Sequence, residues 1–180
     1  MEQQPAVFID RDGTMIESVD VLTDPAQLRL LPGTIEAIAD LNRRGFLVIG
    51  ITNQPIIEKG LLTLEGLDAI HAKLQEMLSA RGAHFDAFFT CPHRYHPEKD
   101  CECRKPNPGL IDQARAKFSI DMEHSWFVGD RLRDVETGKR AGMKTIFVQT
   151  GGESGDDKFF PDAKPDFVVE DLRAAVKIIR

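Results

Sequence analysis

Hydrophobic and polar positions along this chain form two alternating kinds of segment. Short runs of β-branched and aromatic residues predict buried strands, at 6–9, 46–51, 85–90, 126–128, 145–149 and 167–169. Longer segments between them repeat apolar residues every three to four positions and predict helices, at 34–44, 64–81, 109–117, 135–141 and 172–179. Thr34 and Thr63 stand where the first two helices need N-caps. This order predicts an α/β fold, a doubly wound Rossmann-like parallel sheet with helices on both faces.

The chain has the size and composition of one globular domain. Its 180 residues are 42% hydrophobic and 29% charged. No repeat or linker divides them, so we expect residues 1–180 to form a single domain. The segment 151–164 is rich in Gly, Asp and Pro and is expected to be a loop.

The sequence also bears on compartment and partners. Its apolar runs are far shorter than the roughly 20 residues that cross a bilayer, and Met-Glu-Gln-Gln-Pro at the start is not a signal region. We therefore expect a cytoplasmic protein without membrane contact. The net charge of −6 argues against a nucleic-acid surface. No dimerisation element is evident, so a monomer is expected.

Polar motifs follow four of the predicted strands. They are Asp-Arg-Asp-Gly-Thr at 10–14, Thr-Asn-Gln at 52–54, Arg-Lys-Pro at 104–106 and Gly-Asp-Arg-Leu-Arg-Asp at 129–134. In open α/β sheets ligands bind beyond the carboxyl ends of the strands, so we expect these motifs to meet in one crevice. Carboxylates that meet repel one another unless a cation lies among them, and oxygen ligands suit Mg²⁺. A phosphate group beside the metal and a lysine is the expected ligand.

The residue types allow a phosphatase reaction to be written. Asp10 could attack phosphorus as a carboxylate nucleophile and form an aspartyl-phosphate. Asp12 could protonate the leaving oxygen and later deprotonate the attacking water. Thr52 and Lys105 would supply a hydroxyl and a fixed positive charge for the transferring group. Asp130 would complete the Mg²⁺ site.

Each motif alone also has a simpler interpretation. A single Asp-x-Asp-Gly-Thr is often a solvated turn. Asp130 and Asp134 alone could be a helix cap and a first-turn acid beside the helix dipole. Otherwise Asp134 would hold a metal-bound water or orient Lys105. Four motifs in a consistent order at predicted strand ends favour the catalytic interpretation.

All three cysteines of the chain lie in one polar loop. Cys91-x-His93 and Cys101-x-Cys103 offer four ligands that match a closed tetrahedral Zn²⁺ site. Free thiols or a redox pair are the alternative. Because Cys103 directly precedes Arg104 and Lys105, zinc would also fix these two cations beside the phosphate. His96 is a fifth candidate ligand, but because four ligands already close the site it is expected to be solvated, as are His71, His84 and His124.

These motifs resemble the haloacid dehalogenase (HAD) superfamily of phosphohydrolases, over residues 7 to about 150. The resemblance implies Asp10 as nucleophile, Asp12 as general acid and base, Thr52 in the second motif and Lys105 in the third. It also implies the Mg²⁺ ligands, which are Asp10, Asp130 and the backbone carbonyl of Asp12.

The zinc loop and Arg-Lys-Pro-x-Pro-Gly are similar to the small HAD-IIIA branch. That branch contains the D,D-heptose 1,7-bisphosphate 7-phosphatases and the histidinol-phosphate phosphatases. The resemblance implies no separate cap domain and substrate contacts from Arg104 and Lys105. We expect Asn53 and Arg131 to add to these contacts.

The resemblance favours a phosphorylated sugar, and a heptose bisphosphate in particular, as the substrate. Histidinol phosphate is the alternative, because segments 17–24 and 55–60 differ from the usual heptose pattern and border the substrate. A non-catalytic zinc-loop binding module is a rival from another class. Processing of nucleic-acid ends is a weaker one, because five cations without aromatic platforms suit a small phosphate better.

Overall fold

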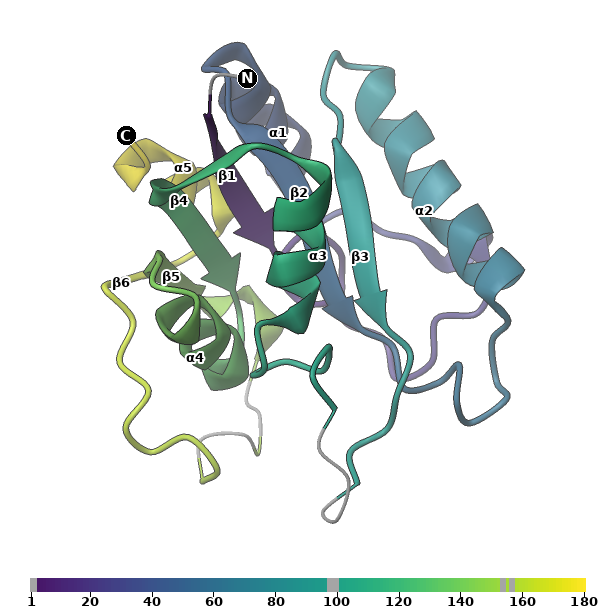
Figure 1. The fold of residues 1–180 in the computed structure, drawn as a ribbon. Coiled ribbons are helices and arrows are strands. Elements are labelled where there is room, and N and C mark those ends of the chain that lie inside the picture. The colour runs from purple at the N-terminus through teal and green to yellow at the C-terminus, as the bar shows by residue number, and fades with distance from the viewer. Residues whose placement is uncertain (1–2, 97–100, 153–154, 156–157) are drawn as a thin grey trace.

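The computed structural model describes residues 3–96, 101–152, 155 and 158–180. Its strands form one sheet in the order β3-β2-β1-β4-β5-β6, and every neighbouring pair is parallel (Figure 1). The strands are β1 (Gln4–Ile9), β2 (Leu47–Asn53), β3 (Ala87–Cys91), β4 (Ile120–Gly129), β5 (Lys144–Val148) and β6 (Phe167–Val169). The strand order reverses between β1 and β4, which confirms the expected doubly wound sheet and marks the position of the crevice.

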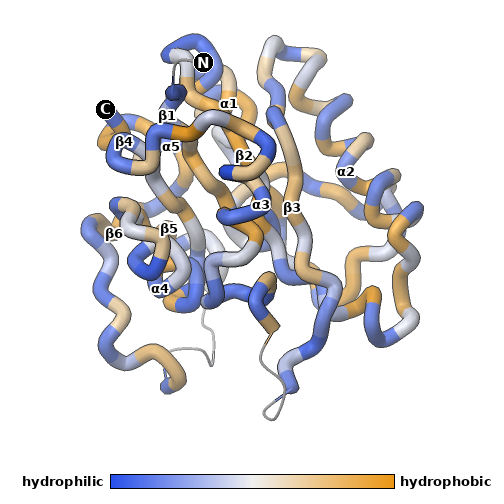
Figure 2. Tube along the Cα trace, viewed as in Figure 1, coloured by the Kyte–Doolittle hydropathy of each residue, from blue (hydrophilic) through white to orange (hydrophobic). Residues whose placement is uncertain are grey.

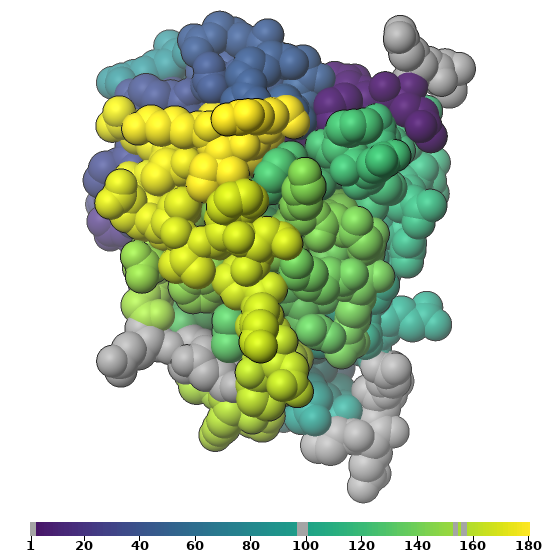
Figure 3. Space-filling model, turned by 90° about the vertical axis from the view of Figure 1, so that its left-hand side faces the viewer, coloured from purple at the N-terminus to yellow at the C-terminus, as the bar shows by residue number. Residues whose placement is uncertain are grey.

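Helices cover both faces of the sheet. One face packs on α1 (Thr34–Arg43), α2 (Leu64–Ser79) and α5 (Leu172–Ile178), and the other on α3 (Gly109–Lys117) and α4 (Leu132–Arg140). Alternate side chains of β1 divide between the two cores: Val7 and Ile9 join the first, Ala6 and Phe8 the second. Figure 3 shows the C-terminal residues in yellow beside the blue of α1, against which α5 packs.

The distribution of hydropathy agrees with these layers. Figure 2 shows hydrophobic colour along the central strands and hydrophilic colour in the loop that follows β3. The side chains of β1 from Ala6 to Ile9 are fully buried, as is common for a central parallel strand. Polar side chains therefore gather where the strands end. No helix in the described part of the chain has the length and apolarity that crossing a bilayer requires.

Two connections at this edge of the sheet are long. Residues 10–33 link β1 to α1 and contain one short 3₁₀ turn, η1 (Pro25–Gln27), and residues 54–63 link β2 to α2. Neither connection, both being fully described, contains a further helix or strand from which a cap domain could be built. A second 3₁₀ turn, η2 (Gln149–Gly151), follows β5.

Of the two expected helix caps, one is confirmed and one is wrong. The hydroxyl of Thr63 accepts a hydrogen bond from the backbone N–H of Gly66 and caps α2. Thr34 is not a cap, because α1 begins at Thr34 and the N-cap is Gly33, with φ +81°. The Thr34 hydroxyl is buried and donates to the carbonyl of Met15 at 2.9 Å, so the β1–α1 connection occupies the group that could have capped the helix.

Several element boundaries also differ from the sequence pattern. β4 begins at Ile120, six residues before the predicted strand. The sequence pattern missed this first part because exposed Glu123 and His124 interrupt its apolar residues. α4 begins at Leu132 rather than at 135, since the Asp134 carboxylate accepts from the backbone N–H of Arg131 and caps a polar first turn.

Candidate active site

Three carboxylates converge at the carboxyl ends of β1 and β4. Asp10 and Asp130 directly follow these adjacent strands, and Asp134 lies in the first turn of α4. All three are buried, at 5%, 2% and 0% exposure. One oxygen from each lies within 4.8 Å of those of the other two. The sheet thus brings together charges that are 120 residues apart in sequence.

Lys105 lies inside this group. Its Nζ is 2.6 Å from Oδ1 of Asp10, 2.6 Å from Oδ1 of Asp134 and 3.1 Å from the carbonyl of Ile51. The amide of Asn53 anchors the lysine backbone from the end of β2, where it accepts from Lys105 N–H at 3.1 Å and donates to the Lys105 carbonyl at 3.2 Å. The third predicted motif is therefore joined to the sheet by two hydrogen bonds.

The electrostatics of this group follow from burial and crowding. Burial disfavours the charged form of Asp10, but the Lys105 ammonium outweighs it and holds the pKa of that carboxyl below its usual range. Burial, followed by repulsion from Asp10 and Asp134, raises the pKa of Asp130 to about 8. Burial opposes the charge on Lys105, yet Asp10 and Asp134 raise its pKa. Lys105 lies beside Asp10 and Asp134, and Arg131 lies beside the third carboxylate, that of Asp130.

The carboxylates fit a divalent cation. Among the described residues, Oδ2 of buried Asp130 has no hydrogen-bond partner, although Nε of Arg131 lies 2.9 Å away in poor geometry for one. Glycines line this oxygen: a Cβ on Gly13 (φ +85°) would come within 2.5 Å of it, and a Cβ on Gly151 within 1.7 Å. Clustered carboxylate oxygens of this kind are hard donors that suit Mg²⁺.

Asp134 combines two interpretations that the sequence left open. Its Oδ2 accepts from the backbone N–H of Arg131 and caps α4, while Oδ1 faces Lys105. A first-turn acid and an orienting group for the lysine are therefore the same side chain. A cap buried in this way also fixes the start of α4 relative to Asp130.

Asp12 lies on the more open side of the group and is held by several donors. Gln54 donates to its Oδ2 at 2.8 Å, and the hydroxyl of Thr52 lies 3.5 Å from the same oxygen. Arg11 donates to both carboxylate oxygens at 3.1 Å. With its side chain 26% exposed, Asp12 is the most accessible of the aspartates discussed.

Three residues near Asp12 were not among the predicted site residues: Gln54 and Arg11, which donate to it, and His71, which lies beside Arg11. Arg11 is only 1% exposed, and the neighbouring Asp10 and Asp12 were the only sequence signal for its role. His71 was expected at the surface, which is wrong: it is 9% exposed, and its ring stacks on Phe88 with centroids 4.3 Å apart. Its apolar flanks on α2 pointed to that buried face, because Leu67 and Leu74 share it.

The predicted substrate contacts lie around this centre. Nε of Arg131 is beside Asp130, and its Nη2 donates to the carbonyl of Gly151 at 3.1 Å. Arg104 donates to the carbonyl of His93 at 2.9 Å. Together with Asn53 these side chains hold neighbouring loops in place, and their contact with substrate stays a prediction.

A second cluster follows β3. The four atoms are Sγ of Cys91, Nδ1 of His93, Sγ of Cys101 and Sγ of Cys103. Cys101 Sγ lies 3.7 Å from Cys91 Sγ and 3.5 Å from Cys103 Sγ, and His93 Nδ1 lies 3.2 to 3.7 Å from the three sulfurs. A tetrahedral Zn²⁺ with usual bond lengths sets these distances at roughly 3.8 and 3.5 Å. The four predicted ligands are therefore already arranged for the metal.

Burial and crowding shift the pKa values of the three thiols in different directions. Burial opposes the charged form of Cys101, but hydrogen bonds from Cys103 and Cys91 outweigh it and lower its pKa. Burial raises the pKa of Cys91, and burial with the neighbouring thiols raises that of Cys103. Zinc binds thiolates, so metal binding would displace these protons. His96, a possible further ligand, is exposed and lies 3.4 Å from the Glu58 carboxylate instead.

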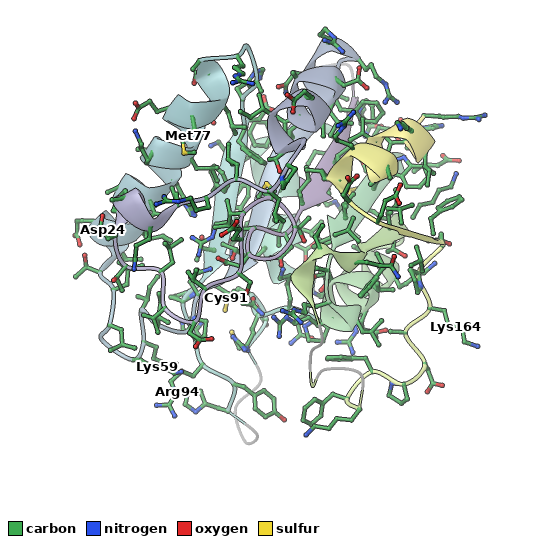
Figure 4. All side chains as sticks on the ribbon, turned by 180° about the vertical axis from the view of Figure 1, so that it is seen from behind. Asp24, Lys59, Met77, Cys91, Arg94 and Lys164 are labelled. Atoms are coloured by element: carbon green, nitrogen blue, oxygen red, sulfur yellow. The ribbon has the colours of Figure 1, made fainter. Side chains whose placement is uncertain are left out.

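Glu58 joins the zinc loop to the β2–α2 connection. Its carboxylate accepts from the backbone N–H of Arg94, and its own N–H donates to the carbonyl of Pro92 at 3.3 Å. Figure 4 shows Lys59 and Arg94 near each other below the end of β3, where Cys91 is labelled. A hollow of about 990 Å³ lies beside the cluster, lined partly by Glu58, His96 and Asp112, and none of the buried aspartates lines it.

Comparison with known proteins gives consistent results. Residues 102–175 match the HAD-hydrolase-like family. The chain is 36% identical over 187 residues to D-glycero-D-manno-heptose-1,7-bisphosphate 7-phosphatase of Chlorobaculum tepidum, covering 98% of this chain and 94% of the relative. It is 35% identical over 146 residues to D-glycero-beta-D-manno-heptose-1,7-bisphosphate 7-phosphatase of Pseudomonas aeruginosa, covering 81% of each.

A solved structure is similar over the whole fold. It is D,D-heptose 1,7-bisphosphate phosphatase from Bordetella bronchiseptica, complexed with magnesium and phosphate. The TM-score is 0.84 with 34% identity, over 97% of each chain. The likeness therefore covers nearly the whole chain.

Proposed function

We propose a function for this chain on the ground that it belongs to the D-glycero-D-manno-heptose 1,7-bisphosphate 7-phosphatase family of HAD-like hydrolases. It is a phosphoric monoester hydrolase, and its proposed reaction is removal of the 7-phosphate from D-glycero-D-manno-heptose 1,7-bisphosphate. The observation that carries the proposal is the buried contact of Asp10 with Lys105, beside Asp130 and Asp134.

In the first step, a carboxylate oxygen of Asp10 attacks phosphorus and the bond to the sugar oxygen breaks. The phosphoryl group is then an aspartyl-phosphate, and Asp12 gives a proton to the departing sugar oxygen. The low pKa of Asp10 keeps this nucleophile ionised. The bond from Lys105 to Oδ1 fixes the rotation of its carboxylate.

In the second step, Asp12 takes a proton from water, and the resulting nucleophile attacks the phosphorus of the aspartyl-phosphate. The bond to Asp10 breaks, and inorganic phosphate and the free carboxylate result. Lys105 and the Thr52 hydroxyl stabilise the oxygens of the transferring group in both steps. Thr52 is 1% exposed and accepts from Gln54 at 2.8 Å, so its hydroxyl position is fixed.

Mg²⁺ would be held by Asp10, Asp130 and the backbone carbonyl of Asp12, and when bound it supplies charge neutralisation for the phosphoryl oxygens. The Asp130 oxygen that lacks a hydrogen-bond partner supports this assignment, as does the pKa of Asp130, which burial and repulsion from Asp10 and Asp134 raise. The magnesium in the B. bronchiseptica relative supports it as well.

Zn²⁺ would be held by the four ligands of the second cluster as a structural ion. With all four positions filled it has no catalytic role. Arg104 follows Cys103 and donates to the carbonyl of His93, so the zinc loop and the substrate-facing cations form one unit. Arg104, Asn53 and Arg131 are proposed to contact the substrate.

Phosphate release in the presence of Mg²⁺ tests the proposal. The panel is both anomers of the heptose bisphosphate, histidinol phosphate and fructose 1,6-bisphosphate. Fast hydrolysis of one heptose anomer is expected. Preference for histidinol phosphate would contradict the substrate and keep the mechanism, whereas no turnover of any ester would favour a non-catalytic binding module.

We further propose that the chain acts as a cytoplasmic monomer on a free small molecule, without nucleic acid. Its net charge of −6 supports the absence of a nucleic-acid partner. Size-exclusion chromatography with light scattering measures the molar mass in solution and tests the monomer. A mass of twice 20.1 kDa would contradict it.

A further inference from the structure

Arg11 has no direct role in the reaction written above. It stands between Asp10 and Asp12 in the sequence, and its side chain is almost completely buried. Its Nε donates to Oδ2 of Asp12 and its Nη2 to Oδ1, both at 3.1 Å. A two-point bond of this kind fixes the plane of the carboxylate as well as its distance. The orientation of Asp12 therefore depends on where the guanidinium lies.

His71 faces the remaining nitrogen of that guanidinium. Nε2 of His71 lies 3.4 Å from Nη1 of Arg11. A guanidinium has five donors and no acceptor, so the imidazole must accept through Nε2 and carry its proton on Nδ1. Burial, followed by the Arg11 charge, lowers the pKa of His71 to about 3, which keeps the ring in this neutral form near pH 7.

The imidazole is itself fixed by the sheet. It lies on α2 and stacks on Phe88 of β3 with an interplanar angle of 15°. Phe88 in turn lies over Gly50 of β2, where an added Cβ would come within 2.2 Å of the Phe88 ring. Packing from two strands and a helix thus sets the position of Nε2.

We propose that His71 and Arg11 are positioning residues for Asp12: His71 holds the outer end of the guanidinium, and Arg11 holds the carboxylate in the orientation from which it exchanges protons. The inference rests on the proposed function, in which Asp12 is the general acid and base. Gln54 also donates to Asp12, so the loss of His71 weakens the orientation without abolishing it.

The test uses two substrates that depend on the acid to different degrees. A sugar phosphate expels an alkoxide and depends on proton donation, whereas p-nitrophenyl phosphate expels a stable nitrophenolate. kcat/KM reports the steps up to the departure of this group. General acid catalysis contributes about 10²- to 10⁴-fold, so His71→Phe is expected to lower kcat/KM roughly tenfold for the sugar phosphate and less than about twofold for the aryl ester.

Two variants serve as controls. Phenylalanine keeps the ring stacking on Phe88 and removes the acceptor, whereas His71→Gln restores an acceptor and is expected to recover most of the sugar phosphatase activity. Ile70→Val shortens a buried neighbour on the same helix and leaves the Arg11 contact in place. It is expected to treat both substrates alike.

Equal losses on both substrates in His71→Phe, or no loss on either, would overturn the inference. A second measurement needs no variant: ¹⁵N NMR of the wild-type protein should show an unprotonated Nε2 on His71 at neutral pH. A protonated Nε2 would also overturn the inference. If the wild-type protein hydrolyses neither substrate, the proposed function fails instead, so the two failures are distinguishable.

Discussion

The carboxylate cluster and the Cys/His cluster lie at the same edge of the sheet but are held in different ways. Asp10 and Asp130 directly follow the central strands β1 and β4, and the side chains of the cluster are buried. In the Cys/His cluster only Cys91 lies on a strand, and Cys101 and Cys103 are partly exposed loop residues. The sheet therefore positions the first cluster, whereas the second must position its own loop.

This difference predicts which property of the protein is lost when a residue of each cluster is changed. Buried carboxylates on a rigid sheet keep their geometry when one of them is changed, so chemistry fails before folding does. A loop with little core of its own depends on its ligands for order, so its stability and substrate binding fail together.

The largest effect is expected from Asp10→Asn. Loss of the nucleophile should lower phosphate release by about 10³-fold or more. The melting temperature should not fall much, because one of three mutually repelling carboxylates is removed and Lys105 keeps Asp134 as a partner. Phosphate release and thermal denaturation check this.

The matched control is Asp112→Asn, an exposed acid on α3 whose ion pair with Arg115 lies at the surface. It should leave both measurements unchanged. Activity near the wild-type level in Asp10→Asn would remove the distinction between the two clusters.

Cys101→Ser should produce the opposite pattern. Loss of an outer-shell partner lowers metal affinity by about 10- to 100-fold, so loss of a ligand itself is expected to lower it at least as much. Catalysis should suffer through a higher KM for the substrate rather than a lower kcat. The melting temperature should fall by several degrees, on the order of 4 °C per kcal/mol. Zinc content, melting temperature and steady-state kinetics check this.

Glu102→Gln changes an exposed neighbour in the same loop and serves as the control. Unchanged KM, zinc content and melting temperature in Cys101→Ser would mean that the zinc loop does not order the site.

His71, which is buried beside Arg11, should give a smaller effect on stability that depends on pH. The folded-state pKa of His71 is lowered to about 3, so protonation favours the unfolded chain. The free energy of unfolding should therefore fall as pH falls below about 6.5, by about 3 kcal/mol down to pH 4. His71→Gln lacks this dependence, and urea denaturation from pH 7 to 4 should show the wild-type advantage shrinking.

If the difference in free energy of unfolding between the wild-type protein and His71→Gln stays constant from pH 7 to 4, the prediction is wrong. His84→Gln, an exposed histidine beside Asp86, is the control and should preserve the wild-type pH dependence below pH 6.5.

The smallest effect concerns a lysine–carboxylate pair at the surface. Lys139 binds Asp166 at 2.7 Å, close to the separation of Lys105 and Asp10, but both side chains are more than 30% exposed. Asp166→Asn should cost about 1 kcal/mol or less. Lys139 and Thr145 outweigh burial and lower the pKa of Asp166, so its contribution is present above pH 4 and is lost as pH falls through that lowered pKa.

Denaturation of Asp166→Asn at pH 7 and at pH 3 checks the size and the sign. A cost of several kcal/mol would show that exposure does not separate this pair from the buried one. Asp162→Asn, an exposed acid in the segment before β6, is the matched control.

Much of the fold could be predicted from local pattern. The apolar runs of β1 and β2 stand out because inner parallel strands are buried on both faces. β4 was placed only in part, because exposed Glu123 and His124 lie inside it, where its pairing with β1 shifts register and their N–H groups donate to the Asp121 carboxylate. Thr34 failed as a cap because Met15, nineteen residues earlier, binds its hydroxyl.

The chemistry of the site could be predicted from residue types and their order in the chain. Asp10, Asp12, Lys105 and Asp130 follow predicted strands, and parallel strands end at one edge, so their convergence needed no coordinates. Likewise, four zinc ligands within thirteen residues predicted their own cluster. By itself, then, the sequence determined the sheet, the edge at which the motifs meet and the class of reaction.

Only the tertiary structure decided which groups are buried and which of them share a charge. That Lys105 lies between Asp10 and Asp134, that Arg11 is covered, and that His71 accepts from it all depend on segments far apart in the chain. The physical reason is that burial and charge interaction are set by distance in space. Polar side chains such as these carry no local signal of the neighbours that will surround them.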